Sequence, residues 1–249
     1  MLAVFDQKIA KCPEGLRWPE VEDGTKSGGV TALLDDFSSV HEGAVTVRLG
    51  SAAFIAFSTD KQNPFLPRLF ASVDDIFCIF QGALINIPLL KQQYGLGKNA
   101  TEDMIVLEVY RTLRDRGPYP VDKVVRDLNG KFAFILFDSS SNSIFIAADA
   151  DGAVPFFWGT DSEDHLIVSD DVEIMKKHCG NHFAPFPKGC FYTSSGGLQS
   201  FEHPLNEVKP VPRVDSKGEV CGSAFVVDTK VKRQTSMPRV GSASDWSKF

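Results

Sequence analysis

The pattern of apolar and polar positions predicts a chain built mainly of β-strands. Residues 2–5 form an apolar run almost at the first residue, and residues 44–57 form two such runs joined near Gly50. The runs at 75–81 and 131–138 are apolar on both faces, which is typical of strands buried between two layers. Residues 142–147 follow the turn 139–141 and complete a β-hairpin. Further strands are expected at residues 154–158, 166–169, 190–194, 198–202 and 223–228.

Three segments carry helix signals. Residues 86–93 predict a short helix closed by Tyr94-Gly95-Leu96-Gly97, because glycine readily adopts the left-handed conformation at a helix end. A second helix is expected to begin at Asn99, where Glu102 three residues later resembles a capping box, and to end at Leu113-Arg114-Asp115-Arg116. A third lies near 171–178, and the polar stretch 12–29 predicts a surface loop. These elements together predict stacked sheets with a few helices outside them.

Composition narrows the class of protein. Of 249 residues, 43% are hydrophobic and 23% are charged, as in a globular domain, and 20 phenylalanines predict a core filled largely by Phe. No apolar run approaches the roughly 18 residues of a membrane span, and the first residues reach charge too soon for a secretory signal. Five cysteines without a Cys-x-x-Cys pair indicate reduced thiols and an intracellular protein. We expect it in the cytoplasm, with the nucleus and the periphery of the plasma membrane left open.

Charge divides the chain into two parts. The net charge is −6, which disfavours a general nucleic-acid binder. Residues 230–249 hold five basic residues and one acidic residue, a balance of +4, so residues 1–229 carry −10. The tail shows no hydrophobic period. We therefore expect one domain over 1–229 and a disordered basic tail over 230–249.

Two clusters of metal-ligating residue types occur in the chain. His178, Cys179 and His182 lie within five residues, but zinc would need a fourth ligand, so surface histidines at a helix end are the favoured interpretation. Four carboxylates could offer oxygen ligands to a cation, although turn and cap roles are favoured for them: Asp149, Asp151, Asp170 and Asp171. We expect no metal site and no cofactor.

Six segments, in order, resemble the N-terminal glutaminase domain of asparagine synthetase, a class-II glutamine amidotransferase. They are residues 2–5, 80–86, the helix after Thr101, 127–134 (Asp-Leu-Asn-Gly-Lys-Phe-Ala-Phe), 148–152 (Ala-Asp-Ala-Asp-Gly) and 186–189 (Phe-Pro-Lys-Gly). The resemblance covers about residues 1–205. It implies a mixed α/β fold, a four-layer α-β-β-α sandwich of the N-terminal-nucleophile hydrolase type.

A narrower resemblance concerns two short motifs. Tyr94-Gly95-Leu96 and Leu113-Arg114-Asp115-Arg116 look like the name-giving motifs of the plant aluminium-induced proteins, also called stem-specific proteins, which likewise begin Met-Leu-Ala. We expect the second motif to be a structural helix end, with Leu113 packed inward and its arginines favoured by the helix dipole.

The chemistry of the amidotransferases is largely absent at the matching positions. Those enzymes use a cysteine exposed after Met removal, whose free amino group serves as its general base, and this chain has Leu2 there. The oxyanion-hole Asn aligns with Gln81, and the backbone N–H of Gly82 is expected to keep half of the hole. The substrate-binding positions align with residues of other chemistry: Ala52 for the carboxylate-clamping Arg, Thr101 for the Asp that holds the amino group, Ala83 for an acidic residue and Ala148 for a second Arg.

These losses together favour a protein that has lost its activity. We expect a catalytically inactive amidotransferase-like protein, without catalytic residues, that acts by binding in plant stress, hormone or aluminium responses. The alternatives are an amidohydrolase of residual or altered activity, or a small-molecule sensor, using the cleft near Gln81. The binding partner is left open, as is a homodimer.

The basic tail contains one further motif. Arg233 precedes Ser236 by three residues and Pro238 follows it by two. Phosphorylation would add about −1.5 to −2 charges at Ser236 and create a pattern of the kind that 14-3-3 proteins grip with an arginine cluster. Two interpretations are left open: Ser236 is a phosphosite that recruits a 14-3-3 protein, or the spacing arises by chance in a solvated tail.

Overall fold

The computed structural model describes residues 1–17, 29–50, 53–60, 62–116, 120–214 and 220–229. Within these ranges two six-stranded sheets and one two-stranded sheet form, and the pairs for which a register is given are antiparallel. The first sheet has the order β10-β8-β9-β1-β3-β2. Its strands are β1 (Leu2–Phe5), β2 (Val45–Leu49), β3 (Ala53–Phe57), β8 (Phe157–Thr160), β9 (Leu166–Ser169) and β10 (Phe183–Pro185).

The second sheet has the order β12-β11-β7-β6-β5-β4. Its strands are β4 (Arg68–Val73), β5 (Ile76–Leu84), β6 (Gly130–Asp138), β7 (Ser143–Ala148), β11 (Cys190–Thr193) and β12 (Gly197–Ser200). A separate hairpin pairs β13 (Val208–Val214) with β14 (Val220–Val227). The helices are η1 (Glu14–Leu16, 3-10), α1 (Gly29–Val40), α2 (Ile87–Tyr94), α3 (Glu102–Asp115), α4 (Val121–Arg126) and α5 (Val172–Cys179).

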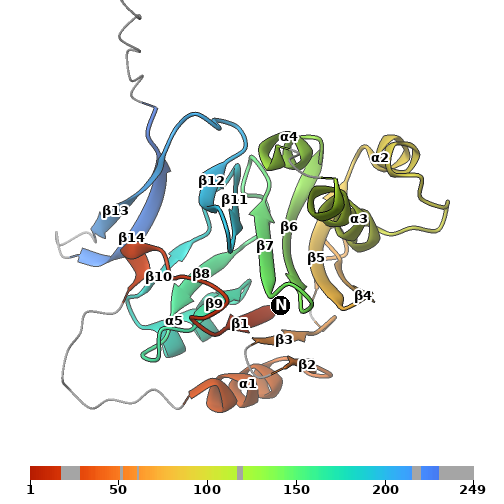
Figure 1. Ribbon diagram of the computed structural model, residues 1–249. Coiled ribbons are helices and arrows are strands. Elements are labelled where there is room, and N and C mark those ends of the chain that lie inside the picture. The colour runs from red at the N-terminus through yellow and green to blue at the C-terminus, as the bar shows by residue number, and fades with distance from the viewer. Residues whose placement is uncertain (18–28, 51–52, 61, 117–119, 215–219, 230–249) are drawn as a thin grey trace, which may run out of the picture.

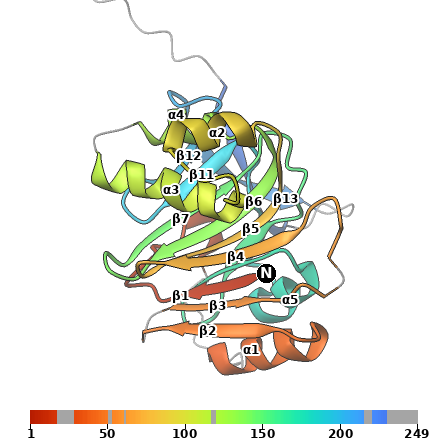
Figure 2. The ribbon, with the colours of Figure 1, turned by 90° about the vertical axis from the view of Figure 1, so that its right-hand side faces the viewer.

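The two large sheets stack face to face between two helical layers (Figure 1). Figure 2 shows the four layers from the side: α2, α3 and α4 lie over the second sheet, and α1 and α5 lie under the first. The expected α-β-β-α sandwich is confirmed. No helix in the described ranges is both long enough and apolar enough to cross a membrane.

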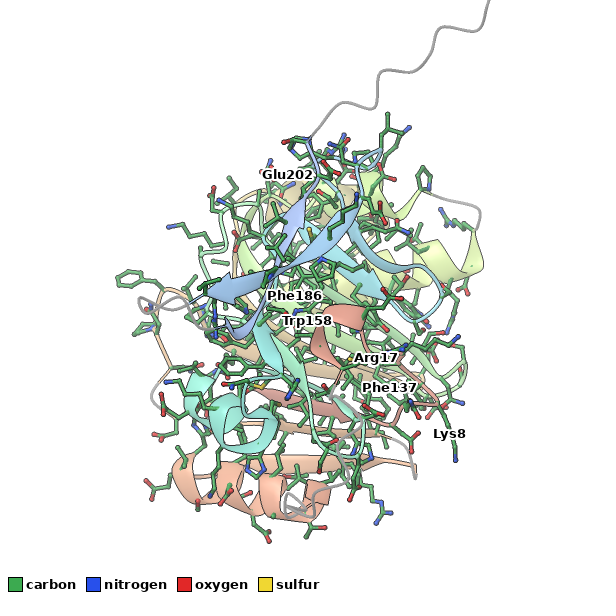
Figure 3. The ribbon with its side chains drawn as sticks, turned by 90° about the vertical axis from the view of Figure 1, so that its left-hand side faces the viewer. Lys8, Arg17, Phe137, Trp158, Phe186 and Glu202 are labelled. Atoms are coloured by element: carbon green, nitrogen blue, oxygen red, sulfur yellow. The ribbon has the colours of Figure 1, made fainter. Side chains whose placement is uncertain are left out.

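The core consists of three layers of buried side chains, one at each interface of the sandwich. Alternation along β1 illustrates the arrangement: Met1, Ala3 and Phe5 face the second sheet, whereas Leu2 and Val4 face α1 and α5. Eight of the twelve largest fully buried side chains are Phe, so the expected Phe-rich core is confirmed. In the interior, Trp158 packs edge-on against Phe186 with 5.0 Å between ring centroids (Figure 3).

The sequence pattern missed several elements. Helix α1, strands β4, β10 and β13, and helix α4 were not predicted, and β8 begins at Phe157 rather than near 154. Helix α1 does carry a signal in the sequence, because Val30, Leu33, Leu34 and Phe37 follow the i, i+3, i+4, i+7 spacing of an amphipathic helix and pack in the layer below the first sheet. Strand β13 includes Pro210 and Pro212, which lower the strand propensity of its sequence.

Two local predictions were wrong. Helix α3 begins at Glu102 after Thr101, not at Asn99, and the Thr101 hydroxyl donates to the Asp103 carboxylate instead of capping the helix. Part of the stretch expected to be a surface loop is buried: Cys12 and Leu16 belong to the core between the sheets. Both residues lie in the segment after β1, where contacts with the core outweigh the polar composition of the segment.

Candidate functional site

The amino end of β1 lies at the edge of the two sheets, beside β4 (Figure 2). The Met1 amino group donates to Asp170 Oδ1, and both groups are almost fully buried. Arg68 of β4 donates from Nε and Nη2 to Asp170 Oδ2, at 2.9 and 2.5 Å. Its Nη1 also donates to the carbonyls of Ser58 and Asp60, at 3.1 and 3.2 Å. The Asp170 carboxylate therefore links the Met1 amino group, at the start of β1 in the first sheet, to Arg68 of β4 in the second sheet.

The electrostatics of this cluster follow from its charges. Burial by itself would raise the pKa of Asp170, but the positive charges of Met1 and Arg68 outweigh it and hold the pKa below its usual value. Asp170 is therefore ionised, and it accepts from the Arg68 guanidinium and from the Met1 amino group, whose pKa burial holds below its usual value. Neither Arg68 nor the role of Asp170 carried a signal in the sequence, because their contact joins residues 102 positions apart.

Leu2 occupies the position that aligns with the amidotransferase nucleophile. Its side chain is fully buried, and it packs in the layer between the first sheet and helices α1 and α5, together with Ala56 and Ile167. The side chain therefore points away from the space between the sheets, which Met1 enters instead. No thiol or hydroxyl is presented at this position.

Gln81 lies next to Arg68 across the β4–β5 pair, so both side chains emerge on the face toward the first sheet. Gln81 is 6% exposed, and its buried Oε1 accepts no hydrogen bond from the described residues. The adjacent Gly82 N–H donates to the carbonyl of Pro67 at 3.0 Å. The expectation that this N–H remains available as half of an oxyanion hole is therefore wrong.

Gly82 also shows why this position holds a glycine. Its φ is +135°, and a Cβ there would meet the Lys131 carbonyl oxygen at 2.0 Å. Strand β6 approaches β5 too closely for any side chain at that point. The residue is thus required for the close pairing of the two strands.

Two of the remaining positions assigned by the resemblance share the face of Gln81, and one does not. Ala83 follows Gln81 by two residues on β5, and the register that pairs Gln81 with Ala133 and Ala133 with Ala148 places Ala148 two strands away. Thr101 is exposed at the start of α3, in the helical layer outside the second sheet. Ala83 is part of β5, paired with Lys131, and Ala148 is buried between the sheets at the end of β7. Ala52 lies outside the described residues.

The carboxylates considered as cation ligands are engaged elsewhere. Asp149 is buried and accepts from the backbone N–H groups of Phe132, Asp151 and Ala153. Asp171 caps α5 by accepting from the N–H groups of Glu173 and Ile174. The turn and cap roles are confirmed for these two residues. In the described ranges no group of three or more His, Cys, Asp or Glu side chains could hold a metal ion.

His178 is not a surface histidine, contrary to the prediction. It is 6% exposed, and its Nε2 lies 2.8 Å from Asp36 Oδ2 of α1. Lys177 contacts the same carboxylate oxygen at 2.6 Å. These contacts tie α5 to α1, which explains the histidine without a metal.

The first name-giving motif closes helix α2. Gly95 takes φ +67°, and the N–H of Leu96 donates to the Lys91 carbonyl at 2.8 Å. Leu96 and Tyr94 then pack against the core under α3. The predicted helix end is confirmed.

The second motif closes α3 and holds a buried carboxylate. Leu113 is half-buried against the outer core, and Arg116 follows the last helical residue. Arg114 binds the neighbouring Asp115 with two nitrogens and donates from Nη1 to Asp138 Oδ2 at 3.1 Å. Asp138 ends β6, is fully buried and also accepts from the Tyr110 hydroxyl at 3.0 Å.

Asp138 has more partners on the β6–β7 turn. Its Oδ1 accepts from the N–H and hydroxyl of Ser140 and from the N–H of Ser141. Burial alone would raise the pKa of Asp138, but the hydrogen bonds from Ser140, Tyr110 and Arg114 outweigh it and lower the pKa to about 2. Sequence reasoning missed Asp138, although an Asp just before a run of serines is a recognised turn signal.

Comparison with known proteins gives two levels of similarity. The family model for the aluminium-induced proteins matches residues 2–227. The stem-specific protein TSJT1 of Nicotiana tabacum is 43% identical over 148 residues, which make up 59% of this chain and 99% of that protein.

The second level is more distant. Asparagine synthetase B of Escherichia coli is 27% identical over 126 residues, 49% of this chain and 21% of that protein. Asparagine synthetase 1 of Arabidopsis thaliana is 35% identical over 95 residues, 37% of this chain and 16% of that protein. The chain thus spans about a fifth of these enzymes, and the similarity is to their glutamine amidotransferase domain. Among solved structures, the glutamine phosphoribosylpyrophosphate amidotransferase of B. subtilis matches 61% of this chain and 35% of its own, with 17% identity and a TM-score of 0.44.

Removing the carboxylate of Asp170 should destabilise the fold strongly. In Asp170→Asn, two buried cations lose their compensating charge, so we expect the free energy of unfolding to fall by about 3–5 kcal/mol in urea titrations. The matched control is Asp74→Asn, which removes the carboxylate of an exposed ion pair with Arg111 and should change stability by about 1 kcal/mol or less. Equal effects of the two substitutions would contradict the importance of the buried cluster.

Asp138 should make stability depend on acid pH. Its pKa in the folded protein, about 2, lies below the unfolded value near 3.9, so its stabilising contribution is complete above about pH 5 and is lost as the pH falls toward 2. The stability gap between the wild type and Asp138→Asn should therefore shrink by about 1–2 kcal/mol between pH 6 and pH 2.5. Tyr110→Phe, which removes one donor to this carboxylate, should show a smaller change. A gap that is constant over this range would refute the assignment.

Proposed function

The chain belongs to the aluminium-induced protein family, and on that premise we propose that it is a catalytically inactive relative of the class-II glutamine amidotransferases that acts by binding. The observation that carries the proposal is the amino end of β1: Leu2 offers no nucleophile, and Asp170 holds the neighbouring amino group. The process it would serve is a plant stress, hormone or aluminium response, in line with the family.

The nucleophile and its base form one unit in the amidotransferase mechanism. A thiol attacks the substrate amide, and the free amino group of the same residue accepts the thiol proton. In this chain the amino group belongs to Met1, is buried and is committed to a carboxylate that Arg68 also holds. The chain therefore has neither the thiol nucleophile at residue 2 nor a free amino group to act as its base.

The surroundings of the site support the same conclusion. An oxyanion hole needs N–H donors that are aimed at the developing charge, and the Gly82 N–H is bonded to Pro67. Substrate recognition needs charged partners for a free amino acid, and Thr101 and Ala83 supply no charge. A swapped nucleophile would leave these substrate contacts in place, so their joint loss favours lost activity.

One observation favours a second candidate function. The buried Oε1 of Gln81 accepts no hydrogen bond from the described residues, and an unsatisfied buried acceptor is unfavourable by about 1–3 kcal/mol. A small ligand with an N–H donor would relieve that penalty. The alternatives are therefore a small-molecule sensor, or an amidohydrolase of altered activity, that uses the space beside Gln81.

The pure protein should release no ammonia from glutamine. Leu2→Cys alone should not restore the activity, because the substrate contacts that the resemblance assigns to Ala52, Ala83 and Thr101 are still missing. An assay of ammonia and glutamate, with thermal unfolding measured in the same glutamine titration, checks both statements.

The remaining outcomes of this assay separate the alternatives. Ammonia release that Gln81→Leu abolishes would overturn the proposal in favour of the altered enzyme. A rise in melting temperature with glutamine, without ammonia release, would favour the sensor. The exposed substitution Lys98→Gln is the control for both measurements.

We also propose that the tail beyond residue 229 regulates binding. Ser236 lies outside the described residues, so the proposal rests on its spacing from Arg233 and Pro238. A peptide of residues 230–249 phosphorylated at Ser236 should bind a 14-3-3 dimer at least tenfold more tightly than the plain peptide, because the arginine cluster of the groove pairs with the phosphate. Fluorescence anisotropy measures both affinities. Equal weak binding of the two peptides would end this proposal.

A further inference from the structure

A cavity lies beyond the end of β1 that is opposite to Met1. Its volume is about 310 Å³, and its lining consists of Gln7, Lys8, Lys11, Cys12, Arg17 and Asp164. The first five belong to the segment after β1, and Asp164 belongs to the turn between β8 and β9. Figure 3 shows Lys8 and Arg17 on the face of the molecule that carries this cavity. The length of β1, about 13 Å for four residue steps, separates it from the Asp170 cluster.

The charge of the cavity is opposite to that of the chain. Three cations and one carboxylate line it, a balance of +2, whereas residues 1–229 together carry −10. Lys8, Lys11 and Arg17 make no ion pair with any residue in the described ranges. Three uncompensated cations around one concavity attract an anion, and an arginine fork matches the oxygens of phosphate.

The cationic segment is held in place by hydrogen bonds to its backbone. The Tyr192 hydroxyl donates to the Lys11 carbonyl at 2.9 Å, and the Ser223 hydroxyl donates to the Gly15 carbonyl at 2.5 Å. Thr160 donates to the carbonyl of Leu16, the residue before Arg17. The donors come from three different strands, so the cavity is formed before any ligand arrives, which lowers the entropy lost on binding.

The inner wall of the cavity suits an anion as well. Cys12 is buried, and its Sγ donates to the Pro13 carbonyl at 3.2 Å. Burial raises the pKa of Cys12 to about 11, so the thiol is uncharged at neutral pH and does not repel a phosphate. Gln7 and Asp164 add neutral and acidic acceptors beside the cations, which fit the hydroxyl groups of a ligand.

We propose that this cavity binds a small phosphate monoester that carries hydroxyl groups, of the sugar phosphate class. Lys8, Lys11 and Arg17 hold the phosphate, and Asp164 accepts a hydroxyl of the ligand. The site is independent of the proposed function, because it shares no residue with the Asp170 cluster or with Gln81.

The test is isothermal titration of the full chain at about 0.15 M salt with glucose 6-phosphate, inorganic phosphate and glucose. Glucose 6-phosphate should bind about tenfold more tightly than inorganic phosphate, and glucose alone should not bind. Arg17→Gln and Lys11→Gln should each weaken the binding of glucose 6-phosphate about fivefold or more. Lys98→Gln, which removes an exposed charge on the α2–α3 connection, should leave it unchanged. These side chains are exposed, and melting temperatures verify that the variants fold.

The substitution Asp164→Asn distinguishes recognition of the ligand's hydroxyl groups from attraction of its phosphate by charge alone. The residue has φ +61°, a conformation that Asn accepts readily, so the turn is preserved. Loss of the negative charge should strengthen the binding of inorganic phosphate, while the weaker, uncharged amide acceptor that replaces the carboxylate should reduce the preference for glucose 6-phosphate to about twofold or less. A preference that persists in this variant would overturn the role of Asp164 and with it the proposed ligand class.

Other outcomes would overturn the site. Equal binding of phosphate and glucose 6-phosphate would indicate an adventitious ion only, and an equal effect of Lys98→Gln would indicate unspecific attraction. A lipid headgroup is the other source of such a phosphate. Binding to phosphatidylcholine vesicles that contain phosphatidylinositol 4-phosphate, without binding of glucose 6-phosphate, would replace the proposal by a membrane contact. None of these results changes the expected absence of glutaminase activity.

Discussion

The rest of the sandwich depends on one buried carboxylate, Asp170, between two cations. It follows the last residue of β9, while Arg68 begins β4 of the other sheet and the Met1 amino group precedes β1. Because Arg68 and the Met1 amino group share this carboxylate in a site of low water access, removing the carboxylate leaves buried positive charge without compensation. The cluster therefore ties the start of β1, a central strand of the first sheet, to β4 at the edge of the second.

The same arrangement links the fold to the proposed function. In this fold an amino group at the start of β1 can act as a base only if it is free, and here it serves as a structural ion-pair partner. The Gly82 N–H is likewise engaged, because it donates to the Pro67 carbonyl. Groups that could stabilise a reacting substrate instead stabilise the protein. The proposed binding of a phosphate ester concerns a different surface, the cationic cavity beside Arg17.

The family motifs also have structural roles that the sequence conveyed only in part. A glycine after Tyr94 and a basic run after Leu113 predicted two helix ends, and the structure confirms both. The partner of Arg114 could not be predicted, because Asp138 belongs to a strand 24 positions away and is recognised only by its burial. Its acid-sensitive contribution to stability is thus a property of the tertiary structure.

The sequence by itself determined the strands that are apolar on both faces, the Phe-rich core and the missing nucleophile at Leu2, because these depend on residue type and on local periodicity. It did not determine the buried position of Cys12 or the pairing of His178 with Asp36, because both depend on contacts between segments that are distant in the sequence. Only the tertiary structure decided that Met1 and Asp170 meet and that Lys8 and Arg17 line one cavity. Electrostatic contacts between distant segments leave no periodic trace in a sequence, so their partners become known only when the chain is folded.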